Sequence, residues 1–417
     1  MAGALPGPAT ALALRDIDLR GAVPVVALGK AAPEMLAAVD DALRERGVAI
    51  ARALVVAAHE DARLAPPVEA IVGDHPLPGR RSARAARRLG TFVRETEGEA
   101  VLVLLSGGTS SLVGAPVDGV TASDYRALCA ALLASGLDIV ATNAIRKRFS
   151  RWGAGRLARA LRPRRVICLA LSDVPGDDVA TIGSGPCVPD ALTAAAIRRL
   201  VRDAGLPLPP SCDAYLARVE RGAARETPKP GDRDLQRART QVIAGETRVL
   251  IPPQAEAERR GHRVVVDPRP LHGDAAEAGR TIARALMGDT PDRPTCILRH
   301  GETTVRLPPG APPGGRCQEL ALAAAEVLRG APHEVVLLAA GTDGRDGPTD
   351  AAGAVVDGTT WEAIRGAGID PSAALAAHDA HRALDAVGAL IRTGATGTNV
   401  GDVVVAIARG STPSPAR

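Results

Sequence analysis

Residues 101–112, VLVLLSGGTSSL, decide the fold. An uninterrupted apolar run is typical of a strand buried on both faces, as in a parallel sheet. The run ends at Leu105, and a polar turn follows it: Ser106, Gly107, Gly108, Thr109 and Ser110. In open α/β sheets, turns at the carboxyl ends of parallel strands are where ligands bind. The stretch therefore predicts an architecture and the place of a site within it.

The same unit recurs on both sides of this stretch. Strand-like runs occupy 24–29 (PVVALG), 53–58, 70–74 and 166–172, and helical stretches rich in Ala, Arg and Leu alternate with several of them. Such alternation predicts βαβ units with right-handed crossovers. We expect an α/β fold whose N-terminal domain is a Rossmann-like, mostly parallel sheet flanked by helices.

A change of composition predicts a second domain. Residues 205–240 are rich in Pro and charge, which favours an exposed connection, so we place the boundary near 235 and expect domains at 1–235 and 236–417. Strand-like runs resume at 241–245 and continue to 402–410. Residues 296–307 (CILRHGETTVRL) look like two short strands around a glycine turn, which predicts an antiparallel pair and a mixed sheet. The tail after Gly410 is expected to be disordered.

Composition excludes several classes of protein. The hydrophobic fraction of 46% is ample for a core, whereas an aromatic share of 1% argues against a base-stacking nucleic-acid platform. The net charge of +4 comes from acids and bases mixed along the chain. One cluster of arginines is predicted to be a solvated helix face: Arg80, Arg81, Arg84, Arg87 and Arg88.

Cysteine spacing and the N-terminus bear on location. The six cysteines contain no C-x-x-C pair, so neither a zinc site nor a disulfide framework is indicated. The N-terminus has an apolar stretch without the basic start of a signal peptide, and no run is long enough to span a bilayer. We expect a reducing, cytoplasmic location.

Common catalytic signatures are absent from the sequence. It contains no G-x-x-x-x-G-K-[ST], no complete G-x-G-x-x-G, no H-E-x-x-H and no G-x-S-x-G. What remains is a set of Gly, Ser and Asp turns after strands. In the 106–110 turn, two glycines let the backbone approach a ligand and successive N–H groups can face an anion. An ordinary strand-to-helix turn is the alternative.

Two cations occupy comparable places. Lys30 directly follows a strand and Gly29 and opens a helical stretch, a position that normally prefers anions, so a bound phosphate is one explanation for it. A solvated surface lysine is the other. Arg316 follows two glycines before an Ala/Leu-rich helix, where a guanidinium suits bidentate binding of carboxylate or phosphate.

Two loops supply carboxylates. Asp173, Asp177 and Asp178 follow the strand at 166–172, with Ser184 and Gly185 after them. Mg²⁺ held by one or two carboxylates and phosphate oxygens would suit this loop, and turn or cap aspartates are the alternative. Asp343 follows a later strand and could accept a proton from a hydroxyl or hold Mg²⁺. Together the loops favour phosphoryl transfer or phosphate binding.

Nearly the whole chain, from Val25 to Ala408, resembles the glycerate 2-kinases with a C-terminal MOFRL domain. The segments that carry the resemblance are GKAAPEM (29–35), DHPLPG (74–79), SGGTSSL (106–112), NAIRKRFSRWGAGRLA (143–158), LSDVPGDD and IGSGPCVPD (171–190), GETTV (301–305), GRCQELAL (315–322), AAGTDGRDGPTDAAG (339–353) and TGATGTNVGD (393–402). The resemblance implies a smaller C-terminal α/β domain of MOFRL type and transfer of the γ-phosphate of ATP, with a divalent cation such as Mg²⁺, to the 2-hydroxyl of glycerate.

The resemblance also implies roles for single residues. Lys30, Arg316 and Asp343 match the family's catalytic lysine, arginine and aspartate. The 106–110 turn is expected to contact the phosphates of ATP through Ser106, Gly107, Gly108, Thr109 and Ser110. Substrate contacts are expected from Arg146, Arg148, Ser184 and Glu319, and metal contacts from Asp173 and Asp178. The expected partner is a small hydroxy acid, without nucleic acid or membrane, and a homodimer is a possible assembly.

The sequence departs from the family pattern in places. Trp152, Gly153 and Ala154 stand where a Lys-Gly-Gly is usual, and Cys187 and Cys317 replace Thr and Asn. Loss of the lysine favours a different acceptor from glycerate, because a charged contact would become apolar. Three alternatives to glycerate phosphorylation therefore stay open: the same chemistry on another hydroxy acid or specialised metabolite, a hydroxypyruvate reductase, and a ligand-binding protein without turnover.

Overall fold

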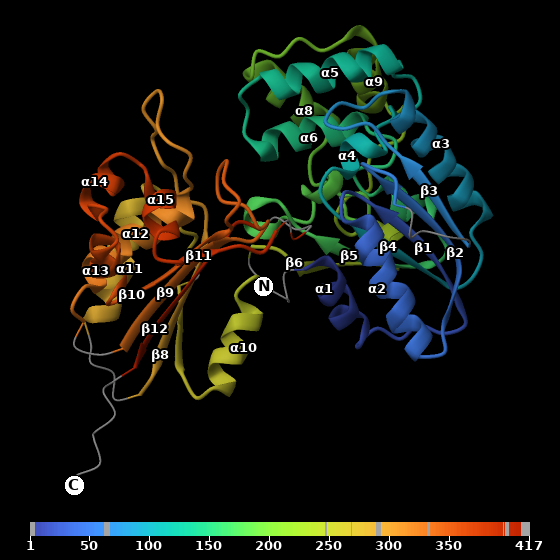
Figure 1. The fold of residues 1–417 in the computed structure, drawn as a ribbon. Coiled ribbons are helices and arrows are strands. Elements are labelled where there is room, and N and C mark those ends of the chain that lie inside the picture. The colour runs from blue at the N-terminus through green and yellow to red at the C-terminus, as the bar shows by residue number, and fades with distance from the viewer. Residues whose placement is uncertain are drawn as a thin grey trace. The chain divides into compact units, whose positions relative to one another are not determined.

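The structure is a computed structural model that describes residues 5–61, 67–246, 248–267, 269–288, 293–331, 334–394, 396 and 400–409 (Figure 1). The chain forms two compact units that divide between Gly245 and Glu246. The predicted boundary at 235 lies before the last strand of the first unit, and the division lies after it. The predicted tail beyond Gly410 falls outside the described residues.

The N-terminal unit is built on a parallel sheet of six strands in the order β3-β2-β1-β4-β5-β6. The strands are β1 (Ala22–Leu28), β2 (Ala49–Ala57), β3 (Val68–Val72), β4 (Ala100–Leu105), β5 (Arg165–Leu171) and β6 (Ala238–Ala244). The chain leaves the neighbouring central strands β1 and β4 toward opposite edges of the sheet. This is the topological switch point at which doubly wound sheets bind ligands. The Rossmann-like prediction is confirmed.

Helices cover both faces of this sheet because its strands are apolar on both faces. Val25 and Ala27 of β1 belong to a core shared with α1 and α2, and Val26 and Leu28 belong to a core shared with α3 and α7. The helices of this unit are α1 (Pro6–Leu14), α2 (Ala32–Glu45), α3 (Arg80–Glu95), α4 (Thr109–Leu112), α5 (Ala122–Ala134), α6 (Ile139–Phe149), α7 (Arg156–Ala160), α8 (Ala194–Asp203) and α9 (Pro210–Glu220), with 3₁₀ turns η2 (Pro175–Asp177), η3 (Ile182–Ser184) and η4 (Arg233–Leu235).

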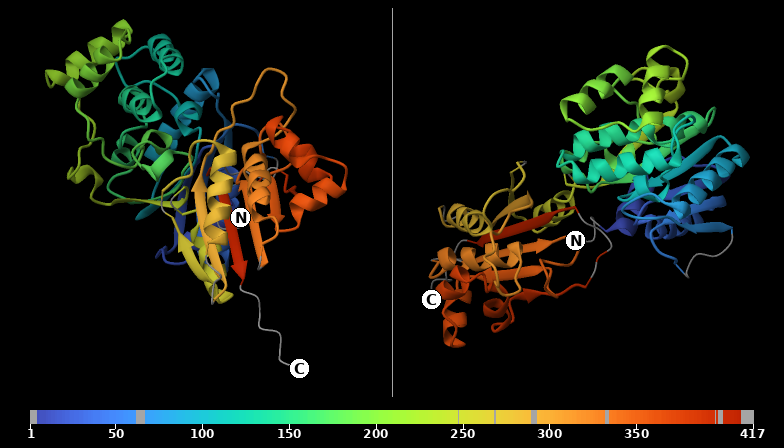
Figure 2. Two further views of the ribbon diagram at one scale, coloured as in Figure 1. Left: turned by 90° about the vertical axis from the view of Figure 1, so that its left-hand side faces the viewer. Right: turned by 90° about the horizontal axis from the view of Figure 1, so that it is seen from above.

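Four of these helices form a cluster of their own. Figures 1 and 2 show α5, α6, α8 and α9 grouped together, and their shared core includes Leu128, Phe149, Tyr215 and Leu216. The prediction of an exposed connection at 205–240 is wrong, because Cys212, Tyr215 and Leu216 bury one face of α9. Two of the prolines that suggested a loop, Pro209 and Pro210, stand at the start of that helix, where a missing N–H costs nothing.

The C-terminal unit contains a mixed sheet in the order β11-β10-β9-β12-β8-β7, as expected. Among these strands only β7 and β8 pair in parallel; the other pairings are antiparallel. The elements are α10 (Ile251–Arg259), β7 (Arg263–Val266), α11 (Ala275–Met287), β8 (Thr295–Gly301), α12 (Arg316–Leu328), β9 (Glu334–Gly341), β10 (Gly353–Asp357), α13 (Thr360–Gly366), α14 (Pro371–Ala376), α15 (Ala380–Asp385), β11 (Leu390–Ile391) and β12 (Asp402–Arg409).

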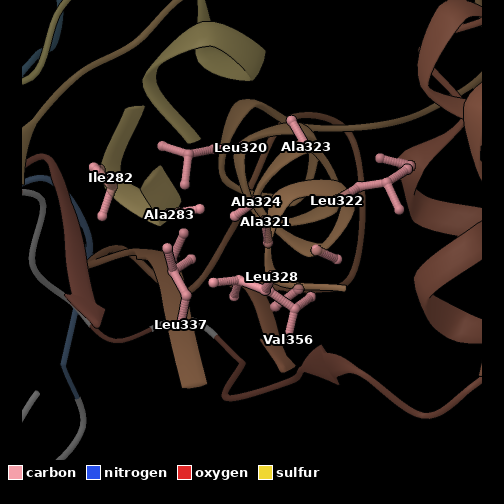
Figure 3. Close-up of a cluster of buried hydrophobic side chains, with 14 of the residues drawn as sticks. Ile282, Ala283, Leu320, Ala321, Leu322, Ala323, Ala324, Leu328, Leu337 and Val356 are labelled. Carbon is pink, nitrogen blue, oxygen red and sulfur yellow. The ribbon is translucent and has the colours of Figure 1, made fainter. Parts of the chain in front are cut away.

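The Ala-rich helix α12 is the centre of this second core. Figure 3 shows Leu320 and Leu328 of α12 among side chains of α11, β9 and β10, such as Ile282, Leu337 and Val356. Every residue from Cys317 to Ala325 is buried. Small alanine side chains let neighbouring helices and the sheet approach closely, which explains how the chain fills its cores with few aromatic residues.

One strand prediction fails here. Residues 296–307 supply only the single strand β8, which pairs antiparallel with β12 rather than with a second strand of its own. Thr304 makes only an isolated parallel bridge to Asp274, at the start of α11. Local alternation predicted a hairpin, but the distant β12 provides the longer apolar partner. No helix within the described residues is long and apolar enough to cross a membrane.

Candidate active site

The turns after β1 and β4 interlock at the switch point. The backbone N–H of Lys30 donates to the carbonyl of Gly107 (2.9 Å), and the N–H of Ser106 donates to the carbonyl of Leu28 (2.9 Å). A Cβ on Gly29 would lie 2.1 Å from the Ser106 hydroxyl oxygen and 2.6 Å from its carbonyl oxygen. Only glycine permits so close a crossing, so the two turns form one rigid platform.

Two charged side chains lie on this platform. The Lys30 side chain runs beside Gly108, with Cγ and Cε 3.3 and 3.4 Å from the place of a Gly108 Cβ. The Asp173 carboxylate, from the turn after β5, lies over Gly107 and would be 2.1 Å from a Cβ there. The glycines thus leave room for an ammonium and a carboxylate directly above the backbone.

His75, in the turn after β3, joins this group. Its Cδ2 atom also approaches Gly108, at 3.3 Å from the place of a Cβ. Partial desolvation and the nearby Lys30 ammonium lower the pKa of His75, and the Asp173 carboxylate offsets this in part. A lowered pKa keeps the imidazole neutral near pH 7, able both to donate and to accept a hydrogen bond.

Ser184 connects a third loop to the glycine turn. Its hydroxyl lies 2.6 Å from that of Ser110, although Ser184 is buried and adopts a left-handed backbone (φ 68°) between two glycines that do the same. The backbone N–H of Ala154 holds the Ser184 carbonyl (2.8 Å). Non-glycine residues rarely take this conformation, and it tends to occur at functional sites. Ser110 also lines a narrow cavity with Arg146.

Several predicted contacts are occupied by the fold itself. The Ser106 hydroxyl accepts from the N–H of Ala31 (3.1 Å), and the Thr109 hydroxyl donates to the carbonyl of Leu28 (2.9 Å). Both side chains therefore tie the platform together, and among the predicted phosphate contacts the Ser110 side chain and the backbone of Gly107 and Gly108 remain candidates.

Arg148 does not fit the predicted role in substrate binding. Its side chain is fully buried, and its Nη1 donates to Thr227 (2.8 Å), lies 3.5 Å from Asp190 and pairs with Glu226. A guanidinium with no exposed surface cannot contact an acid ligand that enters from solvent. The neighbouring Arg146 is only half-buried, donates a hydrogen bond to Asn143 and lines the Ser110 cavity. It therefore remains a candidate for substrate contact.

The predicted metal ligands differ from one another. Asp173 is exposed above Gly107, whereas both oxygens of Asp178 accept local hydrogen bonds, from Thr181 Oγ1 (2.6 Å) and the N–H of Ala180 (3.0 Å). Within the described residues, no three His, Cys, Asp or Glu side chains come together as a metal site. The residues present suit a metal that takes most of its ligands from phosphate and water, with Asp173 as the protein carboxylate.

In the C-terminal unit, Arg316 and Asp343 come together through Asp402. The Arg316 fork donates to both oxygens of Asp402, from Nε at 2.6 Å and from Nη2 at 3.0 Å, and its Nη1 lies 2.5 Å from Glu302. Burial disfavours its charge, but the two carboxylates raise the pKa of Arg316. The Asp343 and Asp402 carboxylates both approach Gly341, at 3.2 and 3.6 Å from the place of a Cβ.

Glu319 is buried beside a histidine. His378 Nδ1 lies 2.9 Å from Glu319 Oε2, and His378 adopts a left-handed backbone (φ 56°). Burial raises the pKa of Glu319, and His378 opposes this in part. In this structure the Glu319 carboxylate therefore contacts His378.

The family departures have structural explanations. Trp152 is buried in the core beside α3, and its indole N–H donates to the Ala86 carbonyl (3.0 Å). Cys187 is buried beside Cys168, and Cys317 is buried in the first turn of α12. All six cysteines are buried free thiols.

Sequence reasoning missed three residues. His75 and Asp402 each stand at a strand end, which is the signal that could have identified them, and His378 has no such signal. Asp346 lies in the segment 339–353. It accepts from the backbone N–H groups of Cys317 (3.1 Å) and Gln318 (2.8 Å) and so caps α12.

Known proteins and family models match nearly the whole chain. Residues 4–217 match a family model described as "Domain of unknown function (DUF4147)", and residues 295–402 match the MOFRL family. The chain is 35% identical to the glycerate 2-kinase of Pyrococcus horikoshii, over 94% of this chain and 89% of that protein. It is 38% identical to a protein of Agrobacterium vitis provisionally named a hydroxypyruvate reductase, over 92% of this chain and 86% of the other.

Its structure resembles that of glycerate kinase from Thermotoga maritima, with a TM-score of 0.83, 34% identity and coverage of 97% of this chain and 96% of the other. The matched region includes both the parallel and the mixed sheet. An enzyme of this kind is a phosphotransferase with an alcohol group as acceptor. On this identity and coverage, the chain belongs to the glycerate kinase family, with a C-terminal MOFRL domain.

Proposed function

We propose that this enzyme phosphorylates the 2-hydroxyl of glycerate with ATP, giving 2-phosphoglycerate and ADP. One observation carries the proposal. At the switch point of the parallel sheet, the side chains of Lys30 and Asp173 lie directly against Gly108 and Gly107. A lysine and exposed backbone N–H groups suit a triphosphate, and a carboxylate suits its metal ion.

The residues present fit a nucleotide. Gly107, Gly108 and Ser110 would hold its phosphates, with Lys30 neutralising their charge and Asp173 holding Mg²⁺. When bound, ATP supplies the phosphoryl group. Phosphoryl transfer asks the protein mainly for positioning and charge compensation, and a preformed platform provides both. Thr109 and Ser106 would contribute by fixing the platform.

For the acceptor, the proposal uses Arg146 and Ser184, which both neighbour Ser110. A carboxylate of the acceptor would pair with Arg146. Asp343 would orient the attacking hydroxyl or accept its proton, and Arg316 would stabilise the transferred phosphoryl group while Asp402 fixes its fork. His75, neutral near pH 7, is a further candidate to donate a hydrogen bond to phosphate. Arg148 and Asp178 have no role in this proposal, because Arg148 is fully buried and Asp178 accepts local hydrogen bonds.

Identification of the reaction product tests this proposal. Purified enzyme with ATP and Mg²⁺ should release ADP with D- or L-glycerate, and enolase added alone should convert the product made from D-glycerate to phosphoenolpyruvate. A product that enolase accepts only after a phosphoglycerate mutase has acted would mean phosphorylation at the 3-hydroxyl. Omission of Mg²⁺ should abolish ADP release.

The alternatives give different results in the same assays. ADP release with another hydroxy acid but not with glycerate would indicate a different acceptor; Trp152 no longer favours this, because it is a core side chain. Oxidation of NADH or NADPH by hydroxypyruvate would support the reductase for which one relative is named. Nucleotide binding without turnover would indicate a binding protein. A cytoplasmic location fits the six free thiols, and a homodimer stays a prediction.

A further inference from the structure

A concentration of arginines surrounds a pocket that the proposed reaction does not use. The pocket has a volume of about 280 Å³ and lies in the N-terminal unit between α7, α9 and the loop at 117–118. Its polar lining comes from Arg151, Arg156, Arg159, Tyr215, Arg218 and Arg225, and Asp118 is the one carboxylate among its described lining residues. We call it the arginine pocket.

Arg156, one of the lining arginines, is held in place by several hydrogen bonds. Arg156 donates to the carbonyls of Lys147 (3.1 Å), Arg148 (2.9 Å) and Ser150 (3.1 Å), and to the hydroxyl of Tyr215 (3.1 Å). These acceptors are all neutral, so they orient the guanidinium without compensating its charge. Rigid placement lowers the entropy lost when a ligand binds.

Charge around the pocket is only partly compensated. Arg151 pairs with Asp118, and Arg225 pairs with Asp234, which also lies 4.0 Å from Arg159. Burial and the nearby Arg225 and Arg156 lower the pKa of Arg159. Arginines crowded in this way repel each other, and a bound anion would relieve that repulsion.

Arg218 is a further arginine of the pocket lining. It is exposed on α9, and its Nη1 lies only 2.5 Å from the place that a Cβ on Gly119 would take. Gly119, which has φ 92°, therefore lets the guanidinium lie directly against the loop that lines the pocket. Guanidinium groups from α7, from α9 and from the segments that follow α6 and α9 thus line one small volume.

We propose that the arginine pocket binds a small phosphate monoester or inorganic phosphate, separately from the nucleotide on the glycine turn. Planar guanidinium forks match phosphate oxygens and bind them with charge-assisted hydrogen bonds. The volume is at the lower end for ligand sites, which favours a molecule of a few carbons over a nucleotide. The concave shape and few aromatic residues disfavour nucleic acid.

The test separates this pocket from the active site by mutation. Binding of inorganic phosphate and of 3-phosphoglycerate is measured by titration calorimetry on the full-length Lys30→Ala protein, in which binding at the glycine turn is weakened. Arg218→Glu is introduced into that background. The matched control is Arg126→Glu, which reverses the same charge on exposed α5, outside the pocket lining. Circular dichroism checks that each variant is folded.

The expected result is one binding event per chain that weakens at least tenfold in the Arg218→Glu protein, is unchanged by Arg126→Glu and weakens with rising salt. Tighter binding of 3-phosphoglycerate identifies an ester as the ligand, and equal binding identifies free phosphate. Absence of binding to folded Lys30→Ala protein, or equal affinity in the two charge-reversal variants, would overturn the proposal. It does not depend on the proposed function, which the ADP assay tests in the wild-type protein.

Discussion

At the scale of single residues, the position of Lys30 supports the proposed chemistry most directly. Its side chain lies on the glycine turn, so Lys30→Ala removes the cation without leaving a cavity in the core. Loss of one charge-stabilising group typically lowers kcat by about 10²–10³-fold, and we expect that loss in the ADP-release assay with little change in thermal stability.

Controls distinguish position from charge. Lys30→Arg should recover part of the activity. Arg20→Ala removes an exposed cation just before the amino end of β1, whereas Lys30 follows its carboxyl end. This variant should leave kcat unchanged. Full activity of the Lys30→Ala enzyme would exclude a role for this residue in transfer.

Gly29 is the residue on which the platform depends. Gly29→Ala would force a Cβ to within 2.6 Å of the Ser106 carbonyl oxygen at φ 126°, and the loss should exceed the ~1–3 kcal/mol typical of overpacking. Gly21→Ala is the control: it has φ 68° but nothing within 4 Å, so only the left-handed backbone cost of about 1 kcal/mol is expected. Urea unfolding measures both, and equal losses would contradict the steric argument.

Glu226 should make the free energy of unfolding depend on pH in the acid range. Burial opposes its ionisation, but Arg148, the Thr227 N–H and Lys229 lower the pKa of Glu226 to about 2. Because the unfolded value is about 4.3, its stabilising contribution is present above that pH and is lost as the pH falls toward 2.

Glu226→Gln tests this dependence. Between about pH 4.3 and pH 2, its free energy of unfolding should fall by about 1–2 kcal/mol less than that of the wild type. This figure allows for solvent screening of the partly exposed Glu226 side chain. Glu220→Gln, in an exposed pair with Arg198, should change the profile less. Thermal melts over this pH range compare the three proteins. Identical slopes for wild type and Glu226→Gln would argue against the pairing.

At the scale of elements, Asp346 decides how α12 begins. Its buried carboxylate accepts from the N–H groups of Cys317 and Gln318 and from the Gln318 side chain (2.9 Å). It therefore occupies the anion-binding N-terminus of the helix that carries Arg316. A phosphate cannot take that position, so any role of Arg316 has to come from its side chain.

Asp346→Asn should destabilise the protein by about 2–3 kcal/mol, because the new amide group turns a donor toward donors in a buried place. Asp274→Asn tests the same change at the exposed N-cap of α11, where one N–H, that of Glu277 (3.0 Å), is held, and should cost less than about 1 kcal/mol. Urea unfolding should separate the two variants; a smaller loss for Asp346→Asn than for Asp274→Asn would reject the capping argument.

At the scale of the whole molecule, the division after Gly245 makes a prediction about independent folding. β6 pairs with β5 and belongs to the N-terminal sheet, and Ile243 and Ala244 are buried there. A fragment of residues 1–245 should unfold cooperatively. A fragment of residues 1–235 should melt at lower temperature or aggregate, because it exposes the edge of β5. Indistinguishable melting curves would place the boundary before β6.

Much of this architecture follows from sequence alone. The apolar runs of β1, β4 and β5, the glycine turns after them and the alternation with helices are local patterns, and hydrophobic burial acts on such patterns directly. They determined the two α/β units, the parallel sheet and the placing of Lys30 and Ser106–Ser110 at strand ends. Where local alternation was the only guide, as at 296–307, it predicted a strand that the fold does not form.

Only the tertiary structure decided which polar side chains remain available. Arg148, in the last turn of α6, is buried against Asp190 and Glu226, and Arg316, at the start of α12, is held by Asp402, 86 residues away in the chain. Long-range packing likewise places the Trp152 ring in a buried core beside α3. The partner of a buried charge or ring is set by long-range packing and desolvation, which no local pattern encodes, whereas the period of a buried strand is encoded within the strand itself.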